Sequence, residues 1–205
     1  MKNDCRAQRF HYSEPAKREA EESLQLLERL DRPYTESSAA VSLALAGDSQ
    51  RALRIADELA RRFPEATSMR AHYLPMIHGA VAIRSGNGSQ ATEAFAAGAL
   101  YEIGEPAFMP DLPLYPVYLH GLACLTAHDG AKATEEFQKI IDLRGDVRNE
   151  PIGALAHLGL GRAYAMTGEK SKAQTAYQDF LALWKDADVD IPILKQAKSE
   201  YAKLK

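Results

Sequence analysis

The chain has 205 residues, 46% of them hydrophobic and 26% charged, which is enough for one globular domain or a row of small repeated units but not for two large domains. Its 25 Lys and Arg residues against 28 Asp and Glu residues give a net charge of −3, which argues against a nucleic-acid-binding protein that works through a basic face. The two cysteines form no CxxC pair, so the sequence predicts neither a disulfide framework nor a zinc site. No apolar stretch follows the N-terminus, which predicts no signal peptide, and no run of about 18 apolar residues occurs, which predicts no membrane span.

The first predicted element is a helix near the N-terminus. Between Ala16 and Leu30, leucines recur on one side and glutamate and arginine residues on the other, which is the pattern of an amphipathic helix. Pro33 follows and favours an end to the helix. We therefore interpret residues 1–33 as an N-terminal helical half-repeat, the second helix of a unit whose first helix is degraded or missing.

Residues 34–191 repeat a pattern of small and aromatic side chains. Four small residues, which we call the anchor residues, are separated by 39, 42 and 40 positions: Ala40, Gly79, Gly121 and Gly161. An alanine follows each anchor residue by 12 positions: Ala52, Ala91, Ala133 and Ala173. Alanine or an aromatic residue follows by 16: Ala56, Phe95, Phe137 and Tyr177. This period of about 40 residues is typical of a repeat protein.

Each repeat predicts a pair of helices. The anchor residue lies in an apolar helical run, where its small size lets a second helix approach closely, and a glycine seven positions later ends the first helix in three of the four units. In the third unit His128 stands at that position, with Gly130 two residues later. The predicted hairpins are 34–64, 66–101, 114–143 and 151–185, followed by a C-terminal capping helix at 192–205.

Connections that contain proline separate the later units. Residues 102–113 and 144–151 predict loops. A single hairpin cannot cover its own apolar face, so neighbouring hairpins must stack. The expected fold is therefore all-α, a right-handed α-solenoid without strands.

The pattern resembles the tetratricopeptide repeat. The fourth unit matches best, since Gly161, Tyr164, Gly168, Ala173 and Tyr177 fall at the family's spacing. The chain departs from the family elsewhere: Cys124 and Thr126 occupy a region where an aromatic residue is usual, and His157 stands where tryptophan is favoured. The period also exceeds the family's usual spacing of roughly 34 residues, which implies longer loops.

A narrower resemblance extends from residue 44 to the C-terminus. The stretches that carry it are 61–65, 114–118, 136–140, 184–188 and 201–204. They look like the C-terminal repeat region of bacterial serine/threonine protein kinases. This resemblance implies a signalling setting, in which a kinase domain precedes the repeats, commonly with a membrane span between them. Similar repeat arrays also follow winged-helix DNA-binding domains.

The sequence holds no pattern that supports catalysis. Residues 81–84 read Val-Ala-Ile-Arg, with arginine in place of the ATP-contacting lysine of kinases, and neither His-Arg-Asp nor Asp-Phe-Gly occurs. The six histidines form no HExxH motif and no i,i+4 pair, so zinc hydrolysis has no support. We expect no enzyme activity from this chain, no cofactor and no metal site.

The candidate partner site lies on the first helices of the hairpins, which line the concave side of such a fold. Six positions before the first three anchor residues stand Tyr34, Tyr73 and Tyr115. The full set of candidate groove residues is Tyr34, Tyr73, Met76, Tyr115, Tyr118, Leu122 and Arg162. Aromatic side chains with few charges favour capture of an apolar peptide. Packing between units is the alternative interpretation of these tyrosines.

We therefore expect a non-catalytic protein-interaction or scaffold module, the sensory or partner-binding part of a bacterial signalling protein. Its partner would be a protein or peptide in the groove, with no nucleic acid and no insertion into a membrane. The alternative is a self-association module that brings attached effector domains together. We expect a soluble, cytoplasmic chain, or an extracytoplasmic one if a kinase and a membrane span precede it. The oligomeric state stays open.

Overall fold

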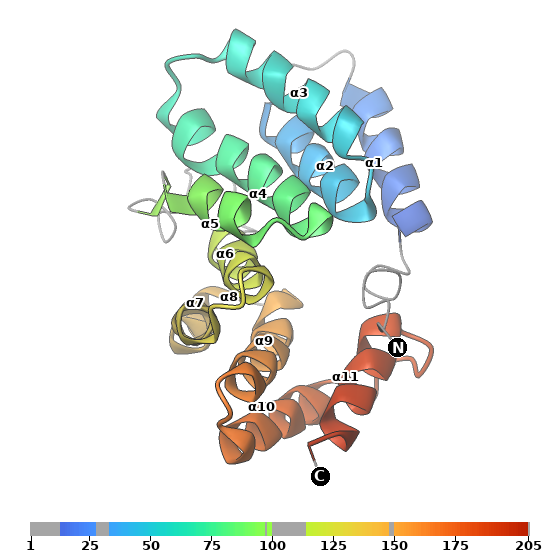
Figure 1. Ribbon diagram of the computed structural model, residues 1–205. Helices are drawn as coiled ribbons and strands as arrows, with labels where there is room; N and C mark the ends of the chain where they lie inside the picture. The colour runs from blue at the N-terminus through green and yellow to red at the C-terminus, as the bar shows by residue number, and fades with distance from the viewer. Residues whose placement is uncertain (1–12, 28–32, 97, 100–113, 148–149, 205) are drawn as a thin grey trace.

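The computed structural model describes residues 13–27, 33–96, 98–99, 114–147 and 150–204, and this part of the chain is all-α, with no strand among its residues (Figure 1). The first helices are α1 (Ser13–Leu27), α2 (Pro33–Ala46), α3 (Ser49–Arg62), η1 (Met69–Tyr73), α4 (Leu74–Ser85) and α5 (Gly88–Ala96). Then come α6 (Tyr115–Thr126), α7 (Gly130–Asp142), α8 (Arg144–Val147), α9 (Ile152–Met166), α10 (Lys170–Leu183) and α11 (Pro192–Ala202).

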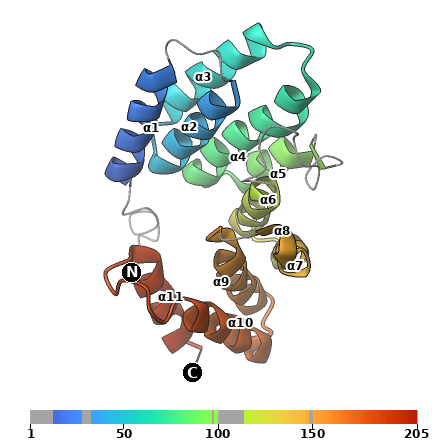
Figure 2. The ribbon, with the colours of Figure 1, turned by 180° about the vertical axis from the view of Figure 1, so that it is seen from behind.

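Helices that follow one another in the sequence pack against one another. The pairs α2–α3, α4–α5, α6–α7 and α9–α10 are in contact, and α4 also contacts α2 and α6, while α9 contacts α6 and α7. Opposite views show α1 to α5 at one end of the molecule, α6 to α8 in the middle and α9 to α11 at the other end (Figures 1 and 2).

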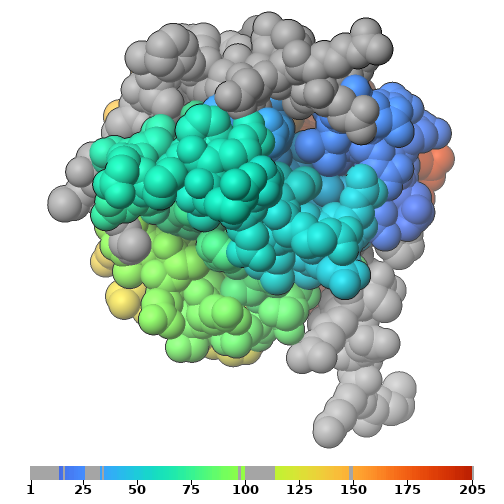
Figure 3. Space-filling view, turned by 90° about the horizontal axis from the view of Figure 1, so that it is seen from above, coloured from blue at the N-terminus to red at the C-terminus, as the bar shows by residue number. Residues whose placement is uncertain are grey.

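The two helices of each pair differ in composition. The first helices, α2, α4, α6 and α9, contain only three Asp, Glu, Lys or Arg residues between them, Glu36, Arg84 and Arg162. By contrast α3 and α7 are strongly amphipathic, with alanines and large apolar residues on the buried side and charges opposite. Figure 3 shows the end of the molecule where α3 (cyan) lies between α1 (blue) and α5 (green).

Three anchor residues allow the predicted close approach of paired helices. A Cβ atom added to Gly79 would lie 2.3 Å from the Phe95 ring. The corresponding distance is 2.7 Å from Gly121 to Phe137 and 2.8 Å from Gly161 to Tyr177. Real Cβ atoms do not come this close, so the ring of the second helix occupies the space that a side chain on the first helix would need. The 16-residue spacing is thus a direct contact in these three pairs.

Phe137 also joins two neighbouring pairs. Its ring lies against Gly121 of α6 and against Gly159 of α9, where an added Cβ would be 2.6 Å away. The side chain is fully buried. One phenylalanine on α7 therefore holds three helices together.

The turns between paired helices use left-handed backbone. Gly47, Gly86 and Gly168 have φ of 97°, 76° and 80°. In the third pair His128 adopts this conformation itself, with φ of 60°, although a β-carbon makes it unfavourable. The glycine two residues later does not serve the turn: Gly130 is the first residue of α7, and an added Cβ would lie 2.9 Å from the Thr167 side chain.

One local prediction from the sequence needs correction. The connection predicted as a loop at 144–151 contains the short helix α8. At the start of the second hairpin, the π-helical turn η1 runs directly into α4. The loop predicted at 102–113 lies outside the described residues. Within the described ranges, none of the helices is long and apolar enough to cross a membrane.

Candidate partner-binding pocket

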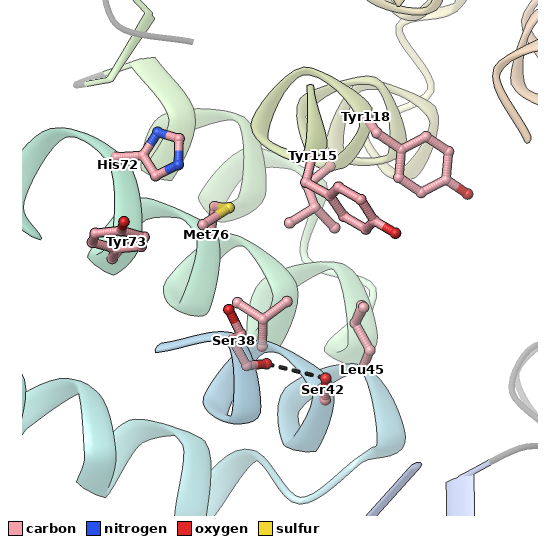
Figure 4. Close-up of a pocket in the computed structure, with 10 residues that line it drawn as sticks. Ser38, Ser42, Leu45, His72, Tyr73, Met76, Tyr115 and Tyr118 are labelled. Atoms are coloured by element: carbon pink, nitrogen blue, oxygen red, sulfur yellow. Dashed lines mark hydrogen bonds between the residues drawn. The ribbon is translucent and has the colours of Figure 1, made fainter. Parts of the chain in front are cut away.

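A cavity of about 270 Å³ lies where α2, the η1–α4 segment and α6 meet; we call it the α2–α4–α6 pocket (Figure 4). Its walls come from first helices only. Helix α2 contributes Ser38, Val41, Ser42 and Leu45, the η1–α4 segment contributes His72, Tyr73 and Met76, and α6 contributes Tyr115, Tyr118 and Leu119. The pocket is mainly apolar, with hydroxyl and imidazole groups as its polar features.

The α2 wall is a stripe on one side of that helix. Positions 38, 41, 42 and 45 follow the i, i+3, i+4, i+7 spacing that places residues on one helical face. The Ser42 hydroxyl donates to the Ser38 carbonyl oxygen at 3.0 Å. Because the Ser42 hydroxyl is satisfied by its own helix, it adds little polarity to this wall.

The η1 wall depends on a widened turn. The Leu74 N–H donates to the Met69 carbonyl oxygen, an i to i−5 bond that encloses one residue more than an α-helical turn. His72 and Tyr73 lie in this turn, and both are buried. Their rings meet edge to face at 5.0 Å between centroids. Burial lowers the pKa of His72 below its usual value, so the imidazole facing the pocket favours its neutral form at neutral pH.

The α6 wall consists of two tyrosines that differ in their hydroxyl partners. The Tyr115 hydroxyl donates to Glu150 Oε2 at 3.2 Å, and burial together with this carboxylate raises the tyrosine pKa. Burial raises the pKa of Tyr118 to about 12, with Arg162 acting in the opposite direction. Both phenols are therefore neutral donors at physiological pH. Figure 4 shows their hydroxyls pointing the same way from α6.

The structure gathers four of the seven candidate groove residues in this pocket: Tyr73, Met76, Tyr115 and Tyr118. Leu122 lies one turn further along α6, half-buried against both neighbouring core clusters, and does not line the cavity. The side chain of Tyr34 lies outside the described side chains, although its backbone belongs to α2.

Arg162 does not line the pocket either, because it is bound to the last helix. Its Nε lies 2.9 Å from Glu200 Oε2 and its second guanidinium nitrogen 3.2 Å from Oε1. The Tyr177 hydroxyl donates to the same carboxylate at 3.0 Å, and Gln196 Nε2 donates to it at 2.8 Å. Burial alone would lower the pKa of Arg162, but Glu200 raises it on balance. We refer to this set as the Arg162–Glu200 cluster.

Several residues that line the pocket were not among the predicted groove residues. Ser38, Val41, Ser42 and Leu45 carry a readable signal, since their helical spacing marks one uncharged stripe opposite the tyrosines. The sequence holds no such signal for His72, because its position in the pocket wall follows from the π-helical turn.

A second, more open hollow of about 400 Å³ lies among α7, α9 and α10. Its lining includes Lys172, His157 and Asp179, and the distance from His157 Nδ1 to Asp179 Oδ2 is 3.6 Å. Over the described ranges, no group of three or more His, Cys, Asp or Glu residues is placed to hold a metal ion. Cys124 of α6 is fully buried.

Comparisons with protein-family models, with curated proteins and with solved structures find no match.

Proposed function

We propose that this chain is a non-catalytic protein-interaction module, a tetratricopeptide-like α-solenoid that holds an apolar peptide segment in the α2–α4–α6 pocket. The observation that carries the proposal is the convergence of Tyr73, Met76, Tyr115 and Tyr118, from two hairpins, on one apolar cavity. Tyrosine and methionine are enriched at protein interfaces, where they provide large contact areas at low entropic cost.

The repeated helix contacts support the solenoid part of the proposal. The same glycine-to-ring contact recurs at Gly79, Gly121 and Gly161, at intervals of 42 and 40 residues. Each first helix also contacts the first helix of the next pair, as in α2–α4, α4–α6 and α6–α9. Repeated units that contact only their neighbours and present a row of first helices are what such a superhelix requires.

The charge distribution supports an interaction role for the first helices. Of their three Asp, Glu, Lys or Arg residues, Glu36 is ion-paired with Arg62 and Arg162 with Glu200. Helices that are apolar on nearly all sides are normally covered. A partner chain would cover the side that the second helices leave open.

Peptide selection from a random library tests the proposal. We expect the purified chain to enrich peptides with large apolar residues, and the double variant Tyr73→Ala/Tyr115→Ala to lose at least about tenfold in affinity for them. Tyr164→Ala is the matched control, because this half-buried tyrosine lies in the second hollow. Failure to enrich any peptide, or equal binding by wild type and a folded double variant, would contradict the proposal.

A self-association module is the second candidate, and one observation favours it. Leu183, the last residue of α10, and Val189, in the connection to α11, have 59% and 67% of their surface exposed. Exposed large apolar side chains are candidates for a contact surface. Light scattering over a range of concentrations separates the candidates: a mass that rises with concentration in wild type and not in Leu183→Ser/Val189→Ser supports self-association.

A further inference from the structure

The α2–α4–α6 pocket is suited to one side chain of a particular chemistry. Resting on the proposed function, we infer that it takes a single large, uncharged apolar side chain of the partner peptide, of the leucine, phenylalanine or tryptophan class. This residue would anchor the peptide, while the neighbouring peptide residues lie along the first helices.

The first argument is size. Pockets for small molecules and cofactors measure roughly 300–1,000 Å³. The cavity, at about 270 Å³, falls just below that range. Helices wall it on three sides, and its volume is enough for one large apolar side chain. A hot-spot side chain in a desolvated hole at the centre of an interface is the common form of such recognition.

The second argument is charge. None of the lining residues carries a formal charge at neutral pH, since burial favours the neutral form of His72. The charged groups nearest the tyrosine wall are already engaged: Glu150 accepts from Tyr115 and Arg162 is paired with Glu200. A charged side chain that entered would lose its water without gaining a partner of opposite charge, which is costly. The pocket therefore discriminates against acidic and basic residues.

The third argument is the position of one hydroxyl. The Tyr115 hydroxyl is engaged by Glu150, whereas the Tyr118 hydroxyl has no acceptor among the described residues. Tyr118 thus supplies one donor beside an apolar hole. A peptide carbonyl next to the inserted side chain is an acceptor that fits it, because a phenol hydroxyl can donate to a carbonyl oxygen.

The Arg162–Glu200 cluster limits recognition to this place. On α9, the corresponding side is occupied by α11, whose Glu200 binds Arg162 and Tyr177. Among the described residues, α11 therefore covers this side of the fourth pair and leaves no equivalent opening for a second anchoring residue. We expect one dominant anchor in each bound peptide.

Single amino-acid amides test this inference. The probes are the N-acetyl amides of leucine, phenylalanine, tryptophan, glutamate and lysine, titrated into protein labelled with ¹³C in its methionine methyl groups. Met76 lines the pocket and reports occupancy, while Met166, 40% exposed at the end of α9, serves as the internal control. We expect the three apolar amides to shift the Met76 signal saturably, and the two charged amides to bind at least about tenfold more weakly.

Two serine variants provide the structural control. Ser42→Leu places an apolar side chain in the pocket without removing any of its walls, and should abolish the Met76 response to phenylalanine amide. Ser171→Leu makes the same change in the second hollow and should leave the response unchanged. Changing NaCl from about 0.05 to 0.5 M should alter the affinity for phenylalanine amide by less than about twofold, because no ion pair forms.

The outcomes separate this inference from the proposed function. If charged and apolar amides bind equally, or if folded Ser42→Leu responds as wild type does, the inference is wrong. If library peptides bind but no amide shifts Met76, the inference fails and the interaction role stands. If the amides bind in the pocket but no peptide is ever enriched, the pocket chemistry is supported and the proposed function fails.

Discussion

The region around α4 and α6 and the region around α9 and α11 start from the same helix pairing and end with different surfaces. In both, an anchor glycine lies against an aromatic ring of the second helix, Gly121 on Phe137 and Gly161 on Tyr177. Around α4 and α6, the open side of the first helices borders an uncharged cavity. On α9, that side is held to α11 through Arg162 and Glu200.

The difference teaches that the repeat spacing determines how two helices of a pair meet, and that the adjoining helix determines what the pair exposes. The anchor contact needs only one small and one aromatic residue at a fixed distance. The exposure of the first helix depends on residues far away in the sequence, such as Glu200, 38 positions after Arg162. Four predictions test this division, from the largest expected effect to the smallest.

Phe137 tests the contact that both regions share. Phe137→Ala should lower the free energy of unfolding by about 3–5 kcal/mol, because it removes a fully buried ring between α6, α7 and α9. Gly159→Ala alone should cost about 1–3 kcal/mol through its clash with this ring, and much less in the Phe137→Ala background. Urea unfolding of the four proteins measures the coupling. Gly145→Ala is the control, since nothing lies within 4 Å of its added Cβ.

Equal costs of Gly159→Ala with and without the Phe137 ring would show that the ring is not what fills this space.

A change at Glu200 tests whether the Arg162–Glu200 cluster holds α11 against α9. Glu200→Gln should lower the free energy of unfolding by about 1–3 kcal/mol, less than for a fully buried pair because 22% of the Arg162 side chain and 25% of the Glu200 side chain are exposed. Hydrogen exchange should quicken in α11 and stay unchanged in α2 to α6. Lys195→Gln, which removes an exposed pair with Asp190, should change little. Faster exchange throughout the chain would contradict a local role for Glu200.

Tyr115 and Tyr118 test the two kinds of hydroxyl in the pocket. Tyr115→Phe should cost about 0.5–1.5 kcal/mol of stability, because Glu150 loses its donor. Tyr118→Phe should stay within about 0.5 kcal/mol of wild type, because the Tyr118 hydroxyl has no acceptor among the described residues. Thermal unfolding of both variants measures the contrast. The reverse order would show that the hydroxyl of Tyr118 is the one engaged in the free protein.

His72 should give the smallest effect, a pH dependence of stability. Its pKa in the folded chain is lowered by burial, so the unfolded chain takes up a proton at higher pH than the folded chain does. The stability from the neutral imidazole is therefore present above about pH 6.5 and is lost as pH falls toward the folded-state value. His157 acts in the same direction, since burial also lowers its pKa despite Asp179.

Urea unfolding between about pH 5 and 8 measures this change. His72→Gln should flatten part of the curve, and His72→Gln/His157→Gln should flatten the rest. A curve that keeps its full slope in the double variant would assign the dependence to other groups.

The elements of this fold that depend on local spacing could be predicted from the sequence. The anchor glycines, their aromatic partners and the left-handed turns at Gly47, Gly86 and Gly168 follow from short-range patterns. Tyr73, Met76, Tyr115 and Tyr118 could be predicted as groove residues for the same reason, because they recur at fixed distances from the anchor residues on the first helices. His128 shows the limit of this logic: the turn keeps its left-handed residue even where the glycine is displaced.

The other features of the fold and of the pocket depend on contacts between residues far apart in the sequence. Arg162 has the position of a groove residue, and only the packing of α11 assigns it to Glu200. The α2 wall could have been found from its uncharged stripe, but nothing in its sequence says which helix faces it. The short helix α8 carries an Arg-Gly-Asp-Val sequence with low helical preference, and its buried Val147 contacts Gly153 of α9.

The π-helical turn η1 makes chain length itself a determinant of the shape of the hollow. Removing one residue from that turn would restore ordinary α-helical hydrogen bonding and rotate the residues before the deletion by about 100° relative to α4. Those residues would then lose their register with Met76, while the glycine-to-ring contacts, which all follow η1 in the sequence, would keep their spacing. A homologue one residue shorter here is therefore expected to keep the helix pairing and to have a hollow of different shape.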